Sequence, residues 1–358
     1  MVFINFDKGY VKIRMNAEKY HRESPYYLVT PKGVRCQICP NNCLLNEEME
    51  SCCHTHFVKD QKLYTLGYGN PCAVHVDPIE KKPLFHFLPG SFSFSISVAG
   101  CNMACLNCQN WEISQQGPLL TRNVELFPDQ VVEEAVKNNC SSIAFTYSEP
   151  IAFYEYVRDT ARLSKARGIK NLFISNGYIN EKPLEDLAGY LDAANIDLKS
   201  FSEETYRKLN RGSLQPVLNT LKLLKRCGVW VEITNLLIPG WNDDMQKIRE
   251  MCNWLASNGF SETPLHFSRF FPLHKLTGFS ITSVKTLEEA HDIAVEAGLQ
   301  YVYVGNLQGN DSENTYCPSC KRLLVKRQGF QIRENHIRGS NCKYCNTRIS
   351  GVWDHLSK

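Results

Sequence analysis

The residues of this 358-residue sequence with the clearest capacity for chemistry are its 16 cysteines. Cysteine thiolates bind soft metals such as zinc and the irons of iron–sulfur clusters. Twelve of them form three groups along the chain: Cys36, Cys39, Cys43, Cys52 and Cys53; Cys101, Cys105 and Cys108; and Cys317, Cys320, Cys342 and Cys345. The other four, which we expect to be buried core residues, are Cys72, Cys140, Cys227 and Cys252.

The middle group, Cys101-x3-Cys105-x2-Cys108, has the short spacing of an iron–sulfur ligand set. A cubane cluster needs four ligands, and only three are local here. Three cysteines leave one iron with open coordination sites, where a substrate or cosubstrate can bind. The alternative is a zinc site completed by a remote ligand.

The first group supplies four thiolates from Cys36, Cys39, Cys43 and Cys53, with Cys52 as the alternative to Cys53. Four thiolates suit structural zinc or an auxiliary iron–sulfur cluster, and the spacing does not choose between them. A set of unpaired core thiols is a third interpretation. His54 and His56 are further candidate ligands.

The last group consists of two Cys-x2-Cys pairs separated by about twenty residues, which predicts a closed zinc ribbon or a rubredoxin-like iron site. The segment 317–348 contains eight Lys or Arg residues and one Glu. This local charge indicates either a solvated face or a clamp for phosphate-rich or acidic partners.

The composition as a whole is that of an ordinary soluble globular protein, with 43% hydrophobic and 22% charged residues. It excludes a mainly disordered, collagen-like or coiled-coil chain. A formal net charge of +3 is too small to imply a nucleic-acid or membrane partner. The opening MVFINFDKGYVKIRM lacks the apolar region of a secretory signal, and no apolar run approaches 18 residues. We therefore expect a cytoplasmic protein with reduced cysteines.

Short β-rich runs alternate with longer helical patterns between about residues 92 and 305. The expected strands are Phe92–Ala99, Ser142–Tyr147, Asn171–Ser175, Ala194–Leu198, Trp230–Ile238, Leu265–Phe270 and Tyr301–Gly305. The expected helices are Pro128–Asn138, Ile151–Arg167, Lys182–Tyr190, Glu203–Leu209, Val217–Cys227, Asp243–Asn258 and Leu287–Ala297. Such repeats build a parallel α/β sheet, either a full or partial barrel or a doubly wound sheet, with its chemistry at the carboxyl ends of the strands.

Three cysteines in the loop after the first strand of such a sheet resemble the radical S-adenosylmethionine (SAM) superfamily, and the resemblance extends over residues 92–305. It implies a partial (β/α)6-type barrel over residues 91–306, preceded by an N-terminal cysteine-rich region (1–90) and followed by the metal ribbon (307–358). It also implies that a [4Fe-4S] cluster on Cys101, Cys105 and Cys108 binds SAM and generates a 5′-deoxyadenosyl radical.

Further turns at strand ends are similar to the family's SAM-binding motifs. These are Tyr147-Ser148-Glu149-Pro150, Ser175-Asn176-Gly177, Asp197-Leu198-Lys199 and Ile238-Pro239-Gly240-Trp241. The resemblance assigns SAM contacts to Glu149, Ser175, Asn176, Asp197, Lys199 and Ile238, and we add His266 from the sixth strand. Each also has a structural interpretation: a turn, a helix cap, an ion pair or a core histidine. The sequence departs from the family where Tyr147 and Ser148 replace two glycines and where Asn107 replaces an aromatic residue.

The flanking motifs resemble the AmmeMemoRadiSam system radical SAM enzymes, often described as pyruvate formate-lyase activating enzyme-like. The motifs are Cys36-Gln37-Ile38-Cys39-Pro40-Asn41-Asn42-Cys43, residues 76–84, Cys108-Gln109-Asn110-Trp111-Glu112 and Asn314-Thr315-Tyr316-Cys317. The resemblance implies an oxidoreductase that abstracts hydrogen from a partner protein or a small molecule. Its expected partners are an electron donor such as flavodoxin or ferredoxin and Memo-like system proteins. An RNA-modifying radical enzyme and a metal-stabilised nucleic-acid-binding protein are the alternatives.

Overall fold

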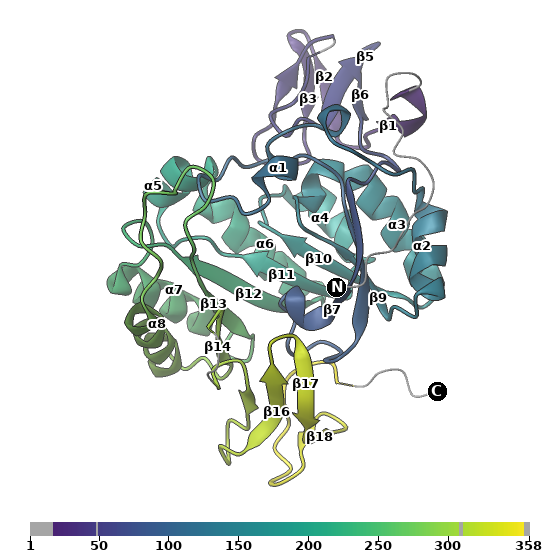
Figure 1. The fold of residues 1–358 in the computed structure, drawn as a ribbon. Coiled ribbons are helices and arrows are strands. Elements are labelled where there is room, and N and C mark those ends of the chain that lie inside the picture. Colours follow the sequence, from purple (N-terminus) through teal and green to yellow (C-terminus); the bar gives the residue numbers. More distant parts are fainter. Residues whose placement is uncertain (1–16, 48, 308–310, 354–358) are drawn as a thin grey trace.

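The computed structural model describes residues 17–47, 49–307 and 311–353. Its centre is one eight-stranded sheet (Figure 1). In spatial order the strands are β14 (Val302–Gly305), β13 (Leu265–Arg269), β12 (Trp230–Leu237), β11 (Ala193–Asp197), β10 (Lys170–Ser175), β9 (Ser142–Phe145), β8 (Phe92–Ser97) and β7 (Ala73–Pro78). Strands β8 to β14 are parallel, and β7 is an antiparallel edge. In the described part of the chain the edge strands β14 and β7 do not pair, so the sheet stays open and the predicted partial barrel is confirmed.

Helices connect the parallel strands as the alternation predicts. They are α2 (Pro128–Lys137), α3 (Tyr154–Ala166), α4 (Glu181–Ala188), α6 (Leu214–Arg226), α7 (Met245–Ser257) and α8 (Val284–Glu296). Leucine, valine and isoleucine side chains on their inner faces are buried in the main hydrophobic core. Helix α3 is followed by Gly168, whose φ of +74° is the left-handed conformation that glycine adopts at low cost.

One predicted helix has a different form. The segment expected as Glu203–Leu209 is a short helix α5 (Glu203–Thr205) continued by a π-helical turn η5 (Tyr206–Asn210). The turn ends at Arg211, which has a φ of +60°. Single π-turns are frequent at functional sites because they re-aim side chains.

A small N-terminal module precedes the sheet and lies at one end of the molecule (Figure 1). It consists of two three-stranded antiparallel sheets that the sequence analysis did not predict. Their strands are β1 (Arg22–Glu23), β2 (Tyr27–Thr30), β3 (Gly33–Cys36), β4 (Leu44–Leu45), β5 (His56–Lys59) and β6 (Lys62–Thr65). The first and last cysteines of the N-terminal group lie on β3 and in the loop before β5.

The C-terminal ribbon lies at the opposite end of the molecule (Figure 1). Its strands are β15 (Thr315–Tyr316), β16 (Leu323–Gln328), β17 (Gln331–Asn335), β18 (Ile337–Arg338) and β19 (Asn341–Cys342). It packs on the barrel through a second hydrophobic cluster that includes Phe85, Tyr301, Tyr303 and Trp353. Tyr301 immediately precedes β14, so the ribbon covers the amino ends of the strands, away from the expected chemistry.

The four ungrouped cysteines are only partly where we expected them. Cys140 and Cys252 are buried and Cys72 is half-buried, but Cys227 is exposed. The core prediction is wrong for Cys227, because this residue caps the solvent-exposed C-terminal end of α6. Among the residues that the structure describes, no helix combines the length and the apolar character needed to cross a membrane.

Candidate metal centre

The loop that follows β8 presents Cys101, Cys105 and Cys108, and polar groups are directed at their sulfur atoms. The backbone N–H of Met103 donates to Cys101 Sγ at 3.4 Å. The Asn176 amide donates to the same sulfur at 3.8 Å, and the Asn210 amide donates to Cys105 Sγ at 3.2 Å. Hydrogen bonds of this kind stabilise thiolates and adjust the potential of the metal that they bind.

The π-turn explains why Asn210 can reach Cys105. Its last two residues accept backbone hydrogen bonds from the cysteine loop, Ala104 to Asn210 O and Leu106 to Leu209 O. The loop and the turn are therefore held as a pair. Nothing in the local sequence identified Asn210, because its role depends on this long-range contact.

Burial raises the pKa of the Cys101 and Cys105 thiols. For Cys101 the Glu149 carboxylate adds to the rise. In the absence of a cation these thiols would stay neutral, whereas a bound metal deprotonates coordinating thiols outright. The donor set, three thiols with N–H groups directed at two of them, thus fits an iron–sulfur cluster.

Glu149 lies in the turn after β9, as the N-cap of the short helix η4 (Pro150–Phe153). Its carboxylate accepts hydrogen bonds from Ser175 Oγ at 2.7 Å, from the Asn176 N–H at 2.8 Å and from the Ile151 N–H at 3.2 Å. The structure therefore brings together the predicted residues Glu149, Ser175 and Asn176. Burial raises the pKa of Glu149 to about 7, so a nearby cation would favour its ionised form.

Tyr147 begins the turn in which the family has two glycines, and its φ of +68° is left-handed. This conformation explains why glycine is the common residue there. The tyrosine is held by its surroundings: its hydroxyl donates to Asp77, its ring lies 5.7 Å from His75, and Lys82 Nζ lies 4.8 Å from its centroid. Sequence reasoning missed this group.

Asp197 and Lys199 form an ion pair of 2.8 Å between Oδ2 and Nζ. Burial alone would lower the pKa of Lys199, but the Asp197 carboxylate outweighs it and raises the pKa well above the usual range. Cys105 is the next contributor to that rise, so the ammonium group lies close to the cysteine loop. The ion-pair interpretation and a site role therefore both fit these residues.

Ile238 belongs to an apolar cluster beside the cysteine loop, with Leu209, Phe270 and Leu276 as buried members and Leu106 packed against them. Asn107 follows Leu106 in the chain. Its Oδ1 is buried and has no hydrogen-bond partner in the described part of the protein. An apolar surface and an unpaired buried acceptor are what the flat face and the amino group of an adenine require. The unpaired oxygen of Asn107 is therefore compatible with an adenine amino group at this position.

His266 lies apart from these residues. Its Nε2 is 2.7 Å from Glu232, and its ring meets Phe85 edge-on at 4.8 Å. The same carboxylate accepts the backbone N–H groups of Phe85 and His86. His266 thus has a structural partner near the end of the barrel that the ribbon covers, and its contact with SAM stays a prediction.

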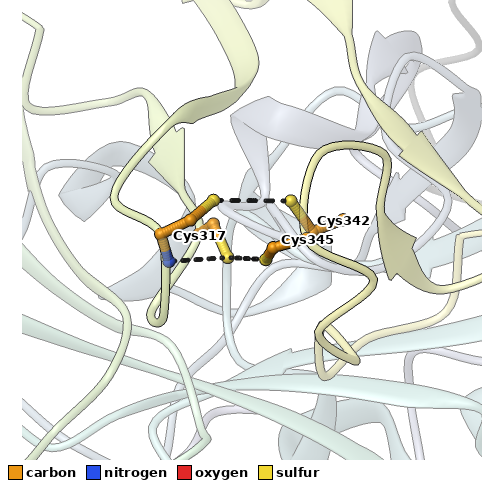
Figure 2. Close-up of side chains that lie close together, drawn as sticks. Cys317, Cys342 and Cys345 are labelled. Atoms are coloured by element: carbon orange, nitrogen blue, oxygen red, sulfur yellow. Dashed lines mark hydrogen bonds between the residues drawn. The ribbon is translucent and has the colours of Figure 1, made fainter.

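The ribbon forms a second, closed site. The four sulfurs of Cys317, Cys320, Cys342 and Cys345 lie within 4.8 Å of one another (Figure 2). The Cys317–Cys345 and Cys320–Cys342 sulfur distances are 3.6 and 3.7 Å. Tetrahedral zinc with Zn–S bonds of about 2.3 Å gives S–S edges of about 3.8 Å. These residues could therefore hold a single metal ion.

One of the eight basic residues counted in the ribbon does not face solvent. Arg327 is buried, donates to the backbone oxygens of Phe85 and Glu313 and to Thr315 Oγ1, and lies 4.2 Å above the Phe85 ring. The hydrogen bonds of its guanidinium group connect the ribbon to the segment that covers the barrel, so this charge does not contribute to a basic surface. Arg327 is therefore not available to bind a phosphate-rich partner, which weakens the nucleic-acid interpretation of the ribbon.

The chain is similar to known proteins over most of its length. The sequence model described as the radical SAM superfamily matches residues 95–252. The chain is 42% identical over 334 residues to an uncharacterised protein of Methanocaldococcus jannaschii, covering 92% of this chain and 99% of that protein. It is 32% identical over 152 residues to the pyruvate formate-lyase 1-activating enzyme of Escherichia coli (strain K12), covering 40% of this chain and 61% of that enzyme. A crystal structure of a domain of pyruvate-formate lyase-activating enzyme from Bacteroides vulgatus covers 46% of this chain and 99% of that one, with 19% identity and a TM-score of 0.40.

Proposed function

Because this chain belongs to the radical SAM superfamily, we propose that it is an oxidoreductase that cleaves SAM reductively and abstracts hydrogen from a substrate. Membership implies a [4Fe-4S] cluster and SAM as cofactors. The observation that carries the assignment of residues is the convergence of N–H donors on two of the three loop cysteines, next to the Glu149 carboxylate. When bound, the cluster supplies one electron that breaks the sulfur–C5′ bond of SAM and yields a 5′-deoxyadenosyl radical.

The chain's own residues hold and orient the cosubstrate in this proposal. Cys101, Cys105 and Cys108 hold the cluster. Glu149, positioned by Ser175 and the Asn176 N–H, pairs with the SAM ammonium group, because a buried carboxylate binds a cation strongly. The Ser175–Asn176 turn and the Asp197–Lys199 pair lie near the SAM carboxylate and ribose.

The residues beside the cysteine loop bind the adenine in this proposal. Ile238 and its apolar neighbours supply a flat contact surface. Asn107 Oδ1 accepts a hydrogen bond from the adenine amino group, which would satisfy its otherwise unpaired oxygen. Asn107 thereby takes a role that an aromatic residue has elsewhere in the family.

The opposite end of the barrel is covered by a buried segment of the chain. The segment 79–88 lies across the amino ends of the strands, where Asn195 donates to Pro83 O and Glu232 accepts two backbone N–H groups of the segment. Arg327 ties the segment to the ribbon. The substrate therefore enters at the carboxyl ends of the strands, and the closed end protects a reactive radical from solvent.

For the substrate, we favour a glycine-containing segment of a partner protein. The activating-enzyme relatives support this choice, as does an apolar rim beside the cysteine loop. Its side chains, all between 38 and 49% exposed, are Trp111, Phe271, Leu273, Phe279 and Ile281. Lys275, in the same segment, donates its N–H to Leu106 O, which fixes the rim next to the cysteines. A contiguous exposed apolar patch marks a protein-binding surface, and we propose that these side chains form one.

The remaining parts of the proposal concern partners and metals. A flavodoxin or ferredoxin supplies the electron. Memo-like proteins of an AmmeMemoRadiSam system are candidate partners on the strength of the motif resemblance alone. Zinc or iron occupies the ribbon and stabilises the fold, because a closed four-thiolate site leaves no position open for chemistry.

The test is anaerobic reduction of the purified protein with dithionite in the presence of SAM, followed by quantification of 5′-deoxyadenosine. Alanine at Cys101, Cys105 or Cys108 should abolish its formation, whereas the exposed Cys227→Ala variant should retain it. Cleavage by the triple cysteine variant would refute the assignment. A glycyl-radical doublet in electron paramagnetic resonance (EPR), formed in a co-purifying partner, would support the activase role; radical transfer to a small molecule alone would exclude it.

A further inference from the structure

The N-terminal thiols, defined here as Cys36, Cys39, Cys43, Cys52 and Cys53, come together in the folded module. Cys43 and Cys52 have their sulfurs 3.4 Å apart. Burial raises the pKa of the Cys39 and Cys36 thiols. Neighbouring thiols raise it further: Cys36, Cys53 and Cys43 for Cys39, and Cys53 and Cys43 for Cys36. All are free, and Cys36, Cys39 and Cys53 are buried. An isolated buried thiol needs no explanation, but five that converge from separate turns indicate a metal centre.

Polar groups surround the Cys53 sulfur in particular. The Ser51 hydroxyl lies 2.9 Å away and accepts the His56 N–H, so its own proton is left for the sulfur. His56 Nδ1 lies 3.5 Å from the same sulfur. The other ring nitrogen of His56 meets both oxygens of the buried Glu155 at 3.2 Å. Polar groups hydrogen-bonded to a ligand atom orient that ligand and adjust the properties of the metal that it binds.

The N-terminal thiols differ from the ribbon in number and in position. The ribbon supplies four thiols at the end of the molecule opposite the N-terminal module (Figure 1). The N-terminal module supplies five thiols beside the central cysteine loop, and Cys43 and Cys52 are as close there as the sulfur pairs of the ribbon. Zinc has no redox chemistry, whereas an iron–sulfur cluster at this position could exchange electrons with the central site.

The module also contacts the central loop directly. The Asn41 side-chain amide donates one proton to Cys52 Sγ at 3.1 Å and the other to Asn102 O at 2.7 Å. Asn102 follows Cys101 in the chain, and its side chain accepts from Asn176, which also donates to Cys101 Sγ. A methyl group on Gly100 would meet Cys53 O at 2.5 Å. Two hydrogen bonds and one residue of backbone therefore connect the two sets of thiols.

We propose that Cys36, Cys39, Cys43 and Cys53 bind a second iron–sulfur cluster, and that this cluster passes electrons to the central one; the transfer step rests on the proposed function. In that step the auxiliary cluster, oxidised from the 1+ to the 2+ state, reduces the central cluster from 2+ to 1+. A low-potential one-electron donor of the flavodoxin or ferredoxin class reduces the auxiliary cluster again. Cys52 lies beside the cluster, and its sulfur accepts the hydrogen bond from the Asn41 amide.

The first experiment measures metal and sulfide without altering the N-terminal thiols. A Cys101→Ala/Cys105→Ala/Cys108→Ala variant, purified anaerobically, should retain about four irons and four acid-labile sulfides per chain. Adding Cys39→Ala should remove the sulfide and the irons of this cluster, leaving at most the single metal ion of the ribbon. Adding Cys227→Ala instead should remove neither iron nor sulfide. Absence of sulfide from the triple variant, with either one or two metal ions per chain, would overturn the proposal, because zinc and rubredoxin-type sites contain none.

The second experiment counts stored electrons. The wild-type protein is fully reduced, freed of dithionite and given excess SAM; it should form about two 5′-deoxyadenosines per chain, and Cys39→Ala about one, since each cleavage consumes one electron. About one from the wild-type protein, with both clusters reduced by EPR, would refute the transfer step. No product from either protein would instead contradict the proposed function, while the sulfide result would still decide whether the second cluster exists.

Discussion

Gly100 precedes the first cysteine of the central loop and offers a direct test of how tightly the N-terminal module is seated there. Its φ is +119°, and an added Cβ would lie 2.5 Å from Cys53 O and 2.5 Å from Thr55 Cγ2. The Cys53 oxygen belongs to the backbone and cannot rotate away. The substitution Gly100→Ala must therefore strain the turn, displace the module or do both.

The expected loss in free energy of unfolding is the sum of two contributions. An L-residue in a left-handed conformation costs about 1–2 kcal/mol, and forcing an extra carbon into a filled contact typically costs about 1–3 kcal/mol more. Gly100→Ala should thus lower the free energy of unfolding by about 2–5 kcal/mol. Gly168→Ala is the matched control, because its φ of +74° is also left-handed but nothing lies within 4 Å of the added carbon.

Anaerobic urea unfolding gives the loss in free energy of unfolding for each of the two variants. Their iron content is measured in parallel. The reasoning requires Gly100→Ala to lose clearly more stability than Gly168→Ala, which should lose only about 1–2 kcal/mol. Equal losses in the two variants would show that the module is not seated against Gly100 as described.

Three further predictions concern the ribbon and Glu149. Replacing Cys317 or Cys342 by alanine should abolish metal binding in the ribbon and lower thermal stability while SAM cleavage persists, because the closed site contributes folding energy; loss of cleavage in a folded variant would contradict this. Arg327→Met leaves buried carbonyl groups unpaired and should cost about 3 kcal/mol in urea unfolding, with no change in the SAM dissociation constant. Because the pKa of Glu149 is raised to about 7, the ionised fraction that binds the ammonium group falls with acidification, so SAM should bind about tenfold more weakly at pH 6 than at pH 8. Glu149→Gln should bind weakly at both pH values, and an unchanged pH profile in this variant would exclude Glu149 as the titrating group.

The barrel could be predicted from local pattern, because each strand is a short apolar run followed by an amphipathic helix. The antiparallel edge β7 could not be, since its residues are mostly half-buried and give no clear alternation. The small sheets of the N-terminal module have strands of two to four residues, too short for a periodic signal.

Among the site residues, Glu149, Ser175 and Asn176 could be placed because strand ends in a parallel sheet lie at one edge. The face occupied by His266 could not be decided from alternation, because its partner Glu232 comes from the neighbouring strand. Arg327 shows the reverse case: it shares a face with the buried Val325, two residues away, and this alternation was available in the sequence.

The central claim is that three protein thiols leave one iron of the cluster open to SAM. Electron–nuclear double resonance of the reduced protein with SAM labelled by ¹⁵N at the amino group tests it most directly. The account predicts a ¹⁵N hyperfine coupling that disappears when Cys101, Cys105 and Cys108 are replaced by alanine. Zinc at these cysteines, or a reduced cluster that shows no coupling to the bound label, would contradict it.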